Sequence, residues 1–148
     1  MNLLLIRHAE TEWNRGGLIQ GHQDSALTAR GLQETTALLT ALAHEFPSVD
    51  AVYTSPAGRA HHMANAIASH FRCPLSVEPL LQEQAFGDYE GMTRMQLRRD
   101  NPLSAEALFS TDALFTPPAV NRSPAPRSVC CLLFGMILLQ PHTPPAAS

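Results

Sequence analysis

The sequence predicts an α/β fold built on a mostly parallel sheet. Short apolar runs alternate with longer stretches whose apolar residues recur at helical spacing, in the order strand, loop, helix, strand, helix, strand. The 148 residues, 45% of them apolar, are enough for one domain with a buried core. In such a sheet, sites form where the strands end and the helices begin. We therefore look for functional residues just after the predicted strands.

Three short runs are the predicted strands. The first, residues 2–6, is an apolar run that stops at Arg7, as a buried strand does. The second covers residues 51–54 and the third covers residues 75–77. Polar residues follow the first two strands directly, so the two strand ends are expected to present polar side chains at one edge of the sheet.

Two helices separate these strands. The first begins after Thr28, a favourable N-cap residue, and runs to about residue 45, with Pro47 just beyond its end. The second starts at Ser55-Pro56 and continues to about residue 71. Residues 8–26, which contain three glycines, are predicted to form a polar loop.

Composition and charge exclude several classes of partner. The formal net charge is −3, which gives no electrostatic footprint for nucleic acid or for an anionic membrane surface. Cys73, Cys130 and Cys131 have no metal-ligand spacing, and an odd number of cysteines does not form a closed disulfide framework. The N-terminal apolar run is too short for a signal peptide, and the longest one, residues 129–139, is about half of a membrane span. We expect a cytoplasmic protein.

The residues that carry chemistry begin with Arg7 and His8, at the end of the first strand. A neutral imidazole attacks phosphorus when one ring nitrogen is free and the other is fixed by a hydrogen bond. An adjacent guanidinium offers a planar fork of donors to phosphate oxygens. An isolated Arg-His pair is more often just the polar end of a strand, so the pair counts only together with the segments that follow.

Two further segments favour a phosphate site. In the loop after the first strand, Asn14 offers an amide donor, and Gly21 allows backbone N–H groups to approach an anion closely. Arg59 lies in the first turn of the second helix, where a cation is unfavourable for the helix dipole unless an anion binds there. The alternative for Arg59 is a solvated residue on a helix face.

A carboxylate segment completes the set. Glu83 lies in a predicted loop among apolar and glycine residues, and Asp88 and Glu90 follow in the same loop. A carboxyl group in such surroundings is a candidate for general acid–base work.

These segments resemble the histidine phosphatase superfamily, also called phosphoglycerate mutase-like. Four stretches carry the resemblance in the order of the family: RHAETEWN at 7–14, GHQDSALTARG at 21–31, TSPAGRA at 54–60 and LQEQAFGDYEG at 81–91. The resemblance covers about residues 2–118. It implies a three-layer sandwich around a mostly parallel central sheet, and small phosphorylated metabolites as substrates.

The resemblance also implies roles for individual residues. His8 would be the nucleophile that becomes phosphohistidine, and Glu83 the acid that protonates the leaving group and then assists water. The implied phosphate-binding residues are Arg7, Asn14 and Arg59. Substrate contacts are expected from Gln20, Gly21 and His22. The resemblance calls for no metal and no cofactor.

Three functions fit this pattern. Cofactor-dependent mutases of the family typically have an arginine directly after the acid glutamate, and this chain has Gln84 there. We therefore favour hydrolysis of phosphate monoesters through phosphohistidine over mutase-type phosphoryl transfer. A catalytically inactive protein that only binds phosphate is the third alternative.

The chain departs from the family near residue 119. We interpret residues 1–118 as a partial histidine phosphatase domain and residues 119–148 as a Pro-rich tail foreign to the family. Residues 113–148 contain no acidic residue, and seven of the twelve prolines lie from Pro117 onward. The family's second half carries a GES-like turn, a long helix and a core strand that ends in a second catalytic histidine, and none of these motifs follows here. We expect a fold that is incomplete at its C-terminal end and turnover that is impaired.

The apolar run 129–139 has two interpretations. It can fill the place of the missing core strand, which would put His142 near the strand's exit. We favour the other interpretation, a tail that stays outside the sheet, because prolines flank the run and Gly135 interrupts it.

A change of reading frame would explain the coincidence of lost motifs and altered composition near residue 119. We then expect another reading frame, downstream of codon 119, to encode a long helix followed by a Ser-His-Gly triplet. Sequencing the gene checks this prediction. If neither alternative frame encodes such a segment, the frameshift interpretation is wrong.

Overall fold

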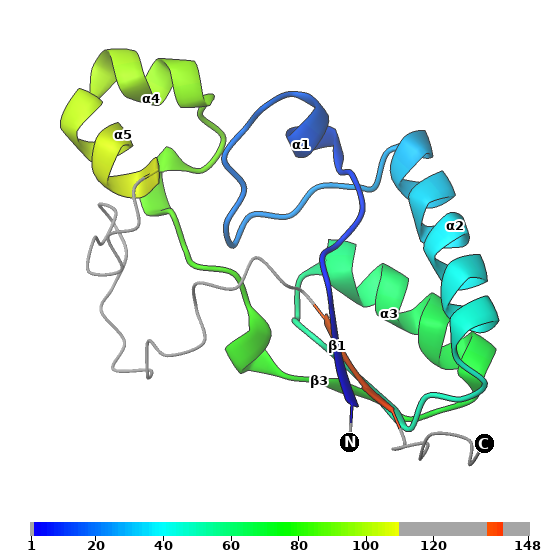
Figure 1. Cartoon of the computed structure of the whole chain (residues 1–148). Coiled ribbons are helices and arrows are strands. Elements are labelled where there is room, and N and C mark those ends of the chain that lie inside the picture. The colour runs from blue at the N-terminus through cyan, green and yellow to red at the C-terminus, as the bar shows by residue number, and fades with distance from the viewer. Residues whose placement is uncertain (1, 110–135, 141–148) are drawn as a thin grey trace, which may run out of the picture.

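The computed structural model describes residues 2–109 and 136–140 (Figure 1). One four-stranded sheet has the order β1-β4-β2-β3, with the bounds β1 Asn2–Ile6, β2 Ala51–Thr54, β3 Leu75–Val77 and β4 Met136–Gln140. The α-helices are α1 Glu12–Arg15, α2 Ala29–Glu45, α3 Gly58–Phe71, α4 Arg94–Asp100 and α5 Pro102–Phe109. Two 3₁₀ turns, η1 Pro79–Leu81 and η2 Gly87–Tyr89, lie between β3 and α4.

The three predicted strands occur with the predicted bounds, and the two predicted helices are α2 and α3. Helix α2 begins after Thr28, whose hydroxyl accepts the backbone N–H of Gly31. Helix α3 begins two residues beyond Pro56, at Gly58. The sequence analysis missed α1, α4 and α5, which have four, seven and eight residues. Helices this short have too little periodicity to be recognised.

Strand β4 lies between β1 and β2, so our expectation that residues 129–139 stay outside the sheet is wrong for residues 136–139. Leu138 pairs with Leu4 of β1 on one side and with Val52 of β2 on the other. Without this strand, β1 and β2 would both expose unpaired backbone N–H and C=O groups. This cost outweighs the preference of the flanking prolines and of Gly135 against a strand. The predicted boundary near residue 118 and His142 lie outside the described residues.

The direction of β4 determines which edge of the sheet its ends reach. Both pairings of β4 are antiparallel, whereas β2 and β3 are parallel, so β1, β2 and β3 share the direction that a parallel sheet requires and β4 alone runs against them. Met136 pairs with Ile6 and Gln140 pairs with Asn2. The chain therefore leaves β4 beside Asn2, at the edge opposite to the one where β1 leads into His8.

Helices α2 and α3 pack side by side against one face of the sheet (Figure 1). Met63 and Ile67 of α3 are almost completely buried there, in one cluster with Ile6 and Val52 of the sheet. The opposite face is open in the described part of the chain, since Leu3 and Leu5 of β1 are 58% and 40% exposed. The described residues thus form two of the three layers that the resemblance implies.

A second apolar cluster holds the loop after β1 against the α4–α5 hairpin. Ile19 packs there with Tyr89, Leu97 and Ala105. Two backbone hydrogen bonds reinforce the contact, because the N–H of Ile19 donates to the carbonyl of Met92 and the carbonyl of Ile19 accepts the N–H of Gly91. No helix in residues 2–109 is long and apolar enough to cross a bilayer.

The central place of β4 predicts a large effect of proline at Leu138. Proline has no N–H to donate and is excluded from central strands, so Leu138→Pro should lower the free energy of unfolding by about 3 kcal/mol or more. Urea denaturation measures the change, with Ala147→Pro, beyond β4, as the control. A Leu138→Pro protein within about 0.5 kcal/mol of the parent would contradict the central position of β4.

Candidate active site

His8 lies just beyond the end of β1, and its ring is fixed by one hydrogen bond. Nδ1 lies 2.8 Å from the carbonyl oxygen of Ala9. Because a carbonyl only accepts, Nδ1 carries the proton and Nε2 keeps its lone pair. Ala9 is itself buried, and its backbone N–H donates to Sδ of Met63 in α3, at 2.9 Å. The core therefore holds the carbonyl that orients the imidazole.

Burial lowers the pKa of the His8 imidazole below its ordinary value. The guanidinium groups of Arg59 and Arg7 lower this pKa further, while the hydrogen bond to Ala9 and the charge of Asp24 act in the opposite direction. A lowered pKa keeps the ring neutral at physiological pH. The neutral ring, with Nε2 free, is the nucleophilic form.

An open cavity of about 870 Å³ lies beside His8. Five of the residues predicted from the sequence line it: Arg7, His8, Asn14, Gln20 and Glu83. Its far side is formed by residues of the α4–α5 hairpin, including Arg94 and Phe109, and the guanidinium of Arg94 lies 4.9 Å from the centre of the Phe109 ring. The cavity has room for the leaving group of a phosphate ester as well as for the phosphate.

Asn14 is oriented by the capping box of α1. Its Oδ1 accepts hydrogen bonds from the backbone N–H of Thr11, at 3.2 Å, and from the Thr11 hydroxyl, at 3.0 Å. The side-chain oxygen is thereby occupied within the protein. The side-chain NH₂ group of Asn14 remains to donate to an anion in the cavity.

Arg59 is held in the first turn of α3 by four acceptors, and the residue is only 3% exposed. Its Nη2 donates to the carbonyl of Gly21 at 2.8 Å and to the carboxylate of Glu83 at 3.0 Å. Its Nη1 donates to the carbonyl of Gln23 at 2.9 Å and to the carboxylate of Asp24 at 3.2 Å. The buried Nε has no hydrogen-bond partner in the described part of the chain.

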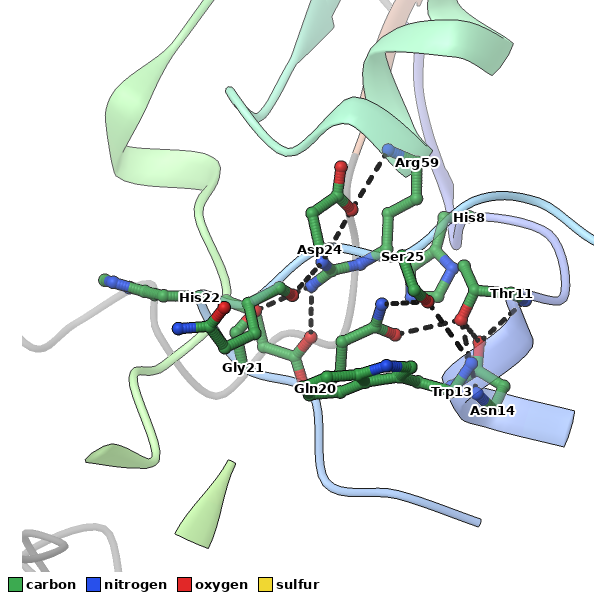
Figure 2. Close-up of polar contacts among 12 residues, drawn as sticks. His8, Thr11, Trp13, Asn14, Gln20, Gly21, His22, Asp24, Ser25 and Arg59 are labelled. Atoms are coloured by element: carbon green, nitrogen blue, oxygen red, sulfur yellow. Dashed lines mark hydrogen bonds and ion pairs between the residues drawn. The ribbon is translucent and has the colours of Figure 1, made fainter. Parts of the chain in front are cut away.

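His8 follows β1, and Arg59 lies at the start of α3, which follows β2. Figure 2 shows the two side chains close to each other. Their charges interact, since Arg59 contributes to the lowered pKa of His8. Glu83 joins them because its carboxylate pairs with Arg59. Glu83 thus connects the cavity that His8 lines to Arg59, which is not among the residues lining that cavity.

The three expected substrate contacts have different surroundings. Gln20 is buried, with Nε2 donating to Oγ of Ser25. Its Oε1 lies 3.0 Å from the Thr11 hydroxyl oxygen, whose single proton is shared between Gln20 and Asn14. Gly21 uses its carbonyl to hold Arg59, where we had expected a role for backbone N–H groups. The His22 side chain is exposed and points away from His8 (Figure 2).

Sequence reasoning did not single out Asp24, and it named Glu90 only as a carboxylate in the loop of Glu83. Asp24 pairs with Arg59, and Glu90 accepts hydrogen bonds from the backbone N–H groups of three residues. Both are acidic residues next to glycine-containing loops, which is a weak local signal. Their partners lie far away in the sequence, so no local pattern could assign these roles. Among the described residues, no three His, Cys, Asp or Glu side chains come together as a metal site.

The fold and the surroundings of His8 define the class of this protein. The chain belongs to the histidine phosphatase superfamily (branch 1), whose family model matches residues 3–126.

Two curated relatives illustrate the similarity. The chain is 42% identical over 90 residues to adenosylcobalamin/alpha-ribazole phosphatase of Escherichia coli strain K12, a match that covers 61% of this chain and 43% of that protein. It is 36% identical over 110 residues to a metal-independent phosphoserine phosphatase of Arabidopsis thaliana, covering 74% of this chain and 46% of the relative. The chain therefore spans less than half the length of either relative.

Solved structures show the same fold. Bacillus stearothermophilus YhfR matches with a TM-score of 0.69 at 32% identity, over 81% of this chain and 58% of that one. A mycobacterial glucosyl-3-phosphoglycerate phosphatase, solved in complex with VO3, matches with a TM-score of 0.68 at 27% identity, over 78% of this chain and 53% of that one.

The environment of His8 predicts how its ring titrates. We expect ¹⁵N NMR to show the proton on Nδ1 and a pKa below the ordinary value of about 6.5, because burial and two arginines disfavour the imidazolium. As the pH falls past about 6.5, the ring should stay mostly neutral until the pH reaches the lowered pKa of His8. Arg7→Gln should raise the pKa of His8, since it removes one of these cations.

Arg15→Gln provides the matched control for this titration. Arg15 is exposed, pairs with Glu12, and is not among the charges that shift the pKa of His8. A pKa of His8 at or above the ordinary value, or a proton on Nε2 of the neutral ring, would contradict the geometry described here.

Proposed function

We propose that this chain hydrolyses phosphate monoesters of small phosphorylated metabolites through a phosphohistidine intermediate on His8. One observation carries the proposal: the Nδ1–H of His8 is fixed to the Ala9 carbonyl, which leaves Nε2 free beside the cavity that Glu83 also lines. Phosphoryl transfer needs an in-line nucleophile and several donors around the phosphoryl oxygens, with little other covalent chemistry.

In the first step, Nε2 of His8 attacks phosphorus in line with the ester oxygen. The bond from phosphorus to Nε2 forms and the bond from phosphorus to the ester oxygen breaks. Glu83, whose carboxylate takes a proton from solvent after it leaves Arg59, gives that proton to the leaving oxygen. The oxygens of the phosphoryl group displace the Glu83 carboxylate from Arg59, so the acid and the arginine separate when substrate binds. Arg7, Asn14 and Arg59 then donate to the phosphoryl oxygens.

In the second step, water attacks the phosphorus of phosphohistidine. The Glu83 carboxylate takes the proton of the water, the bond from phosphorus to Nε2 breaks, and inorganic phosphate leaves. The ring of His8 returns to the neutral form with Nε2 free. We expect this turnover to be slow, because the described residues contain no counterpart of the second histidine that the family places beside the phosphoryl group.

Two observations support hydrolysis and a small substrate. Gln84 stands where family mutases typically have an arginine. The names of the similar proteins point to small phosphate esters: alpha-ribazole phosphatase, phosphoserine phosphatase and glucosyl-3-phosphoglycerate phosphatase. We also propose that the protein acts in the cytoplasm, a reducing compartment, because its three cysteines do not form a closed disulfide framework.

Replacement of His8 and Glu83 separates the two steps. With p-nitrophenyl phosphate as substrate, His8→Ala should reduce hydrolysis to background and abolish acid-labile labelling from a ³²P-phosphate ester. Glu83→Gln should slow hydrolysis by about 100-fold or more, because it removes the proton donor and acceptor. It should still permit labelling of His8 from p-nitrophenyl phosphate, whose leaving group needs little protonation.

His44→Ala is the matched control, because His44 is an exposed histidine near the end of α2. It should keep the parent rates. Labelling of the parent protein without turnover would indicate a protein that stalls at phosphohistidine, and the absence of both signals would refute hydrolysis in favour of anion binding alone. Full activity of His8→Ala would exclude His8 as the nucleophile.

A further inference from the structure

We propose that Glu90 is a positioning residue that holds in place the two loops around Arg59; the inference rests on the function proposed above. Its Oε1 accepts the backbone N–H of His22 at 3.0 Å and that of Phe86 at 2.9 Å. Its Oε2 accepts the backbone N–H of Gln23 at 3.1 Å. One carboxylate therefore links residues 22–23, in the loop after β1, to the loop that carries Glu83.

Both linked loops contact Arg59. The carbonyls of Gly21 and Gln23 accept hydrogen bonds from its guanidinium, and the carboxylate of Glu83 pairs with it from the other loop. Glu90 does not touch Arg59 in any of these contacts. Its effect on the phosphate-binding arginine and on the candidate acid passes through the backbone of their neighbours, which is how residues behind a site usually orient it.

Gly21 is the second part of this clamp. Its backbone has φ of +56°, a conformation that favours glycine. A Cβ atom at this position would lie 2.5 Å from Oε1 of Glu90 and 2.7 Å from Cδ2 of Phe86. The carboxylate can reach the N–H groups of both loops only because residue 21 has no side chain.

A carboxylate suits this position better than an amide does. Glutamine has one acceptor oxygen, which can serve the N–H groups of His22 and Phe86, but its NH₂ group would then face the N–H of Gln23. Glu90→Gln should therefore loosen the clamp partly and Glu90→Ala completely. The N–H of Phe86 is partly buried, so its loss of an acceptor is costly, whereas the exposed N–H groups of His22 and Gln23 can bond to water. The two loops should therefore separate and rearrange.

Hydrogen exchange measures the clamp directly, without any anion. In Glu90→Gln and Glu90→Ala, the amides of residues 22, 23 and 86 should exchange at least about 10-fold faster than in the parent chain, with the larger effect in Glu90→Ala. Asp88→Asn is the matched control, since Asp88 is an exposed carboxylate two residues away. It removes the same charge and should leave these rates unchanged.

Binding of inorganic vanadate and steady-state hydrolysis measure the consequence for the site. Glu90→Ala should weaken vanadate binding by about 10-fold and lower kcat by up to about 100-fold, because displacement of catalytic groups by about 1 Å has effects of this size. Glu90→Gln should give intermediate values, and Asp88→Asn should stay within about two-fold of the parent. Gly21→Ala should weaken vanadate binding at least as much as Glu90→Ala, because its Cβ would meet both Glu90 and Phe86. The effects of the two substitutions together should be less than additive.

The outcomes distinguish this inference from the proposed function. If amide exchange and vanadate affinity are the same in Glu90→Ala as in the parent, Glu90 positions nothing and the inference is overturned. If the exchange rates respond as expected but the parent chain neither binds vanadate nor hydrolyses esters, the clamp is supported and the proposed function fails. Additive effects of Gly21→Ala and Glu90→Ala would also overturn the inference, because two parts of one clamp do not add.

Discussion

The site depends on one constraint, the need of a buried guanidinium for partners. Arg59 is almost fully buried at the start of α3, where the helix dipole disfavours a cation. Two carbonyls from the loop after β1 and two carboxylates compensate its charge. Because these acceptors come from two segments far apart in the sequence, satisfying Arg59 also brings the loop after β1 and the loop of Glu83 together near the end of β1, where His8 lies.

In the function proposed above, an incoming anion binds Arg59 by displacing an acceptor that the guanidinium already contacts. The Glu83 carboxylate occupies one donor of Arg59, whereas the NH₂ group of Asn14 and Nε2 of His8 are left unoccupied by the contacts that orient those side chains. The same features thus serve two purposes. They stabilise a buried charge in the folded chain, and in the function proposed above they would offer an anion a set of oriented donors next to a neutral imidazole.

The sequence predicted the strands β1 to β3, the helices α2 and α3, and the residues that gather around His8. These features follow local rules: buried strands are short apolar runs, and Thr28 is a favourable cap. The roles of Glu90 and Asp24 depend on contacts with residues distant in the sequence, so they became visible only in three dimensions. Strand β4 was misjudged for a related reason, because the unpaired backbone of its two neighbours outweighs the local preference of a proline-flanked segment.

The direction of β4, which is antiparallel to both of its neighbours, shows that a strand can complete a sheet without placing side chains at the site. A backbone ladder is sequence-tolerant, since any extended apolar segment of suitable length can complete it, whichever way it runs. A reaction centre instead requires a given side chain at a given end of a given strand. Here β4 connects β1 to β2, and its C-terminal end lies at the end of the sheet opposite to His8. Similarity of fold therefore does not by itself establish that the same reactive groups are present.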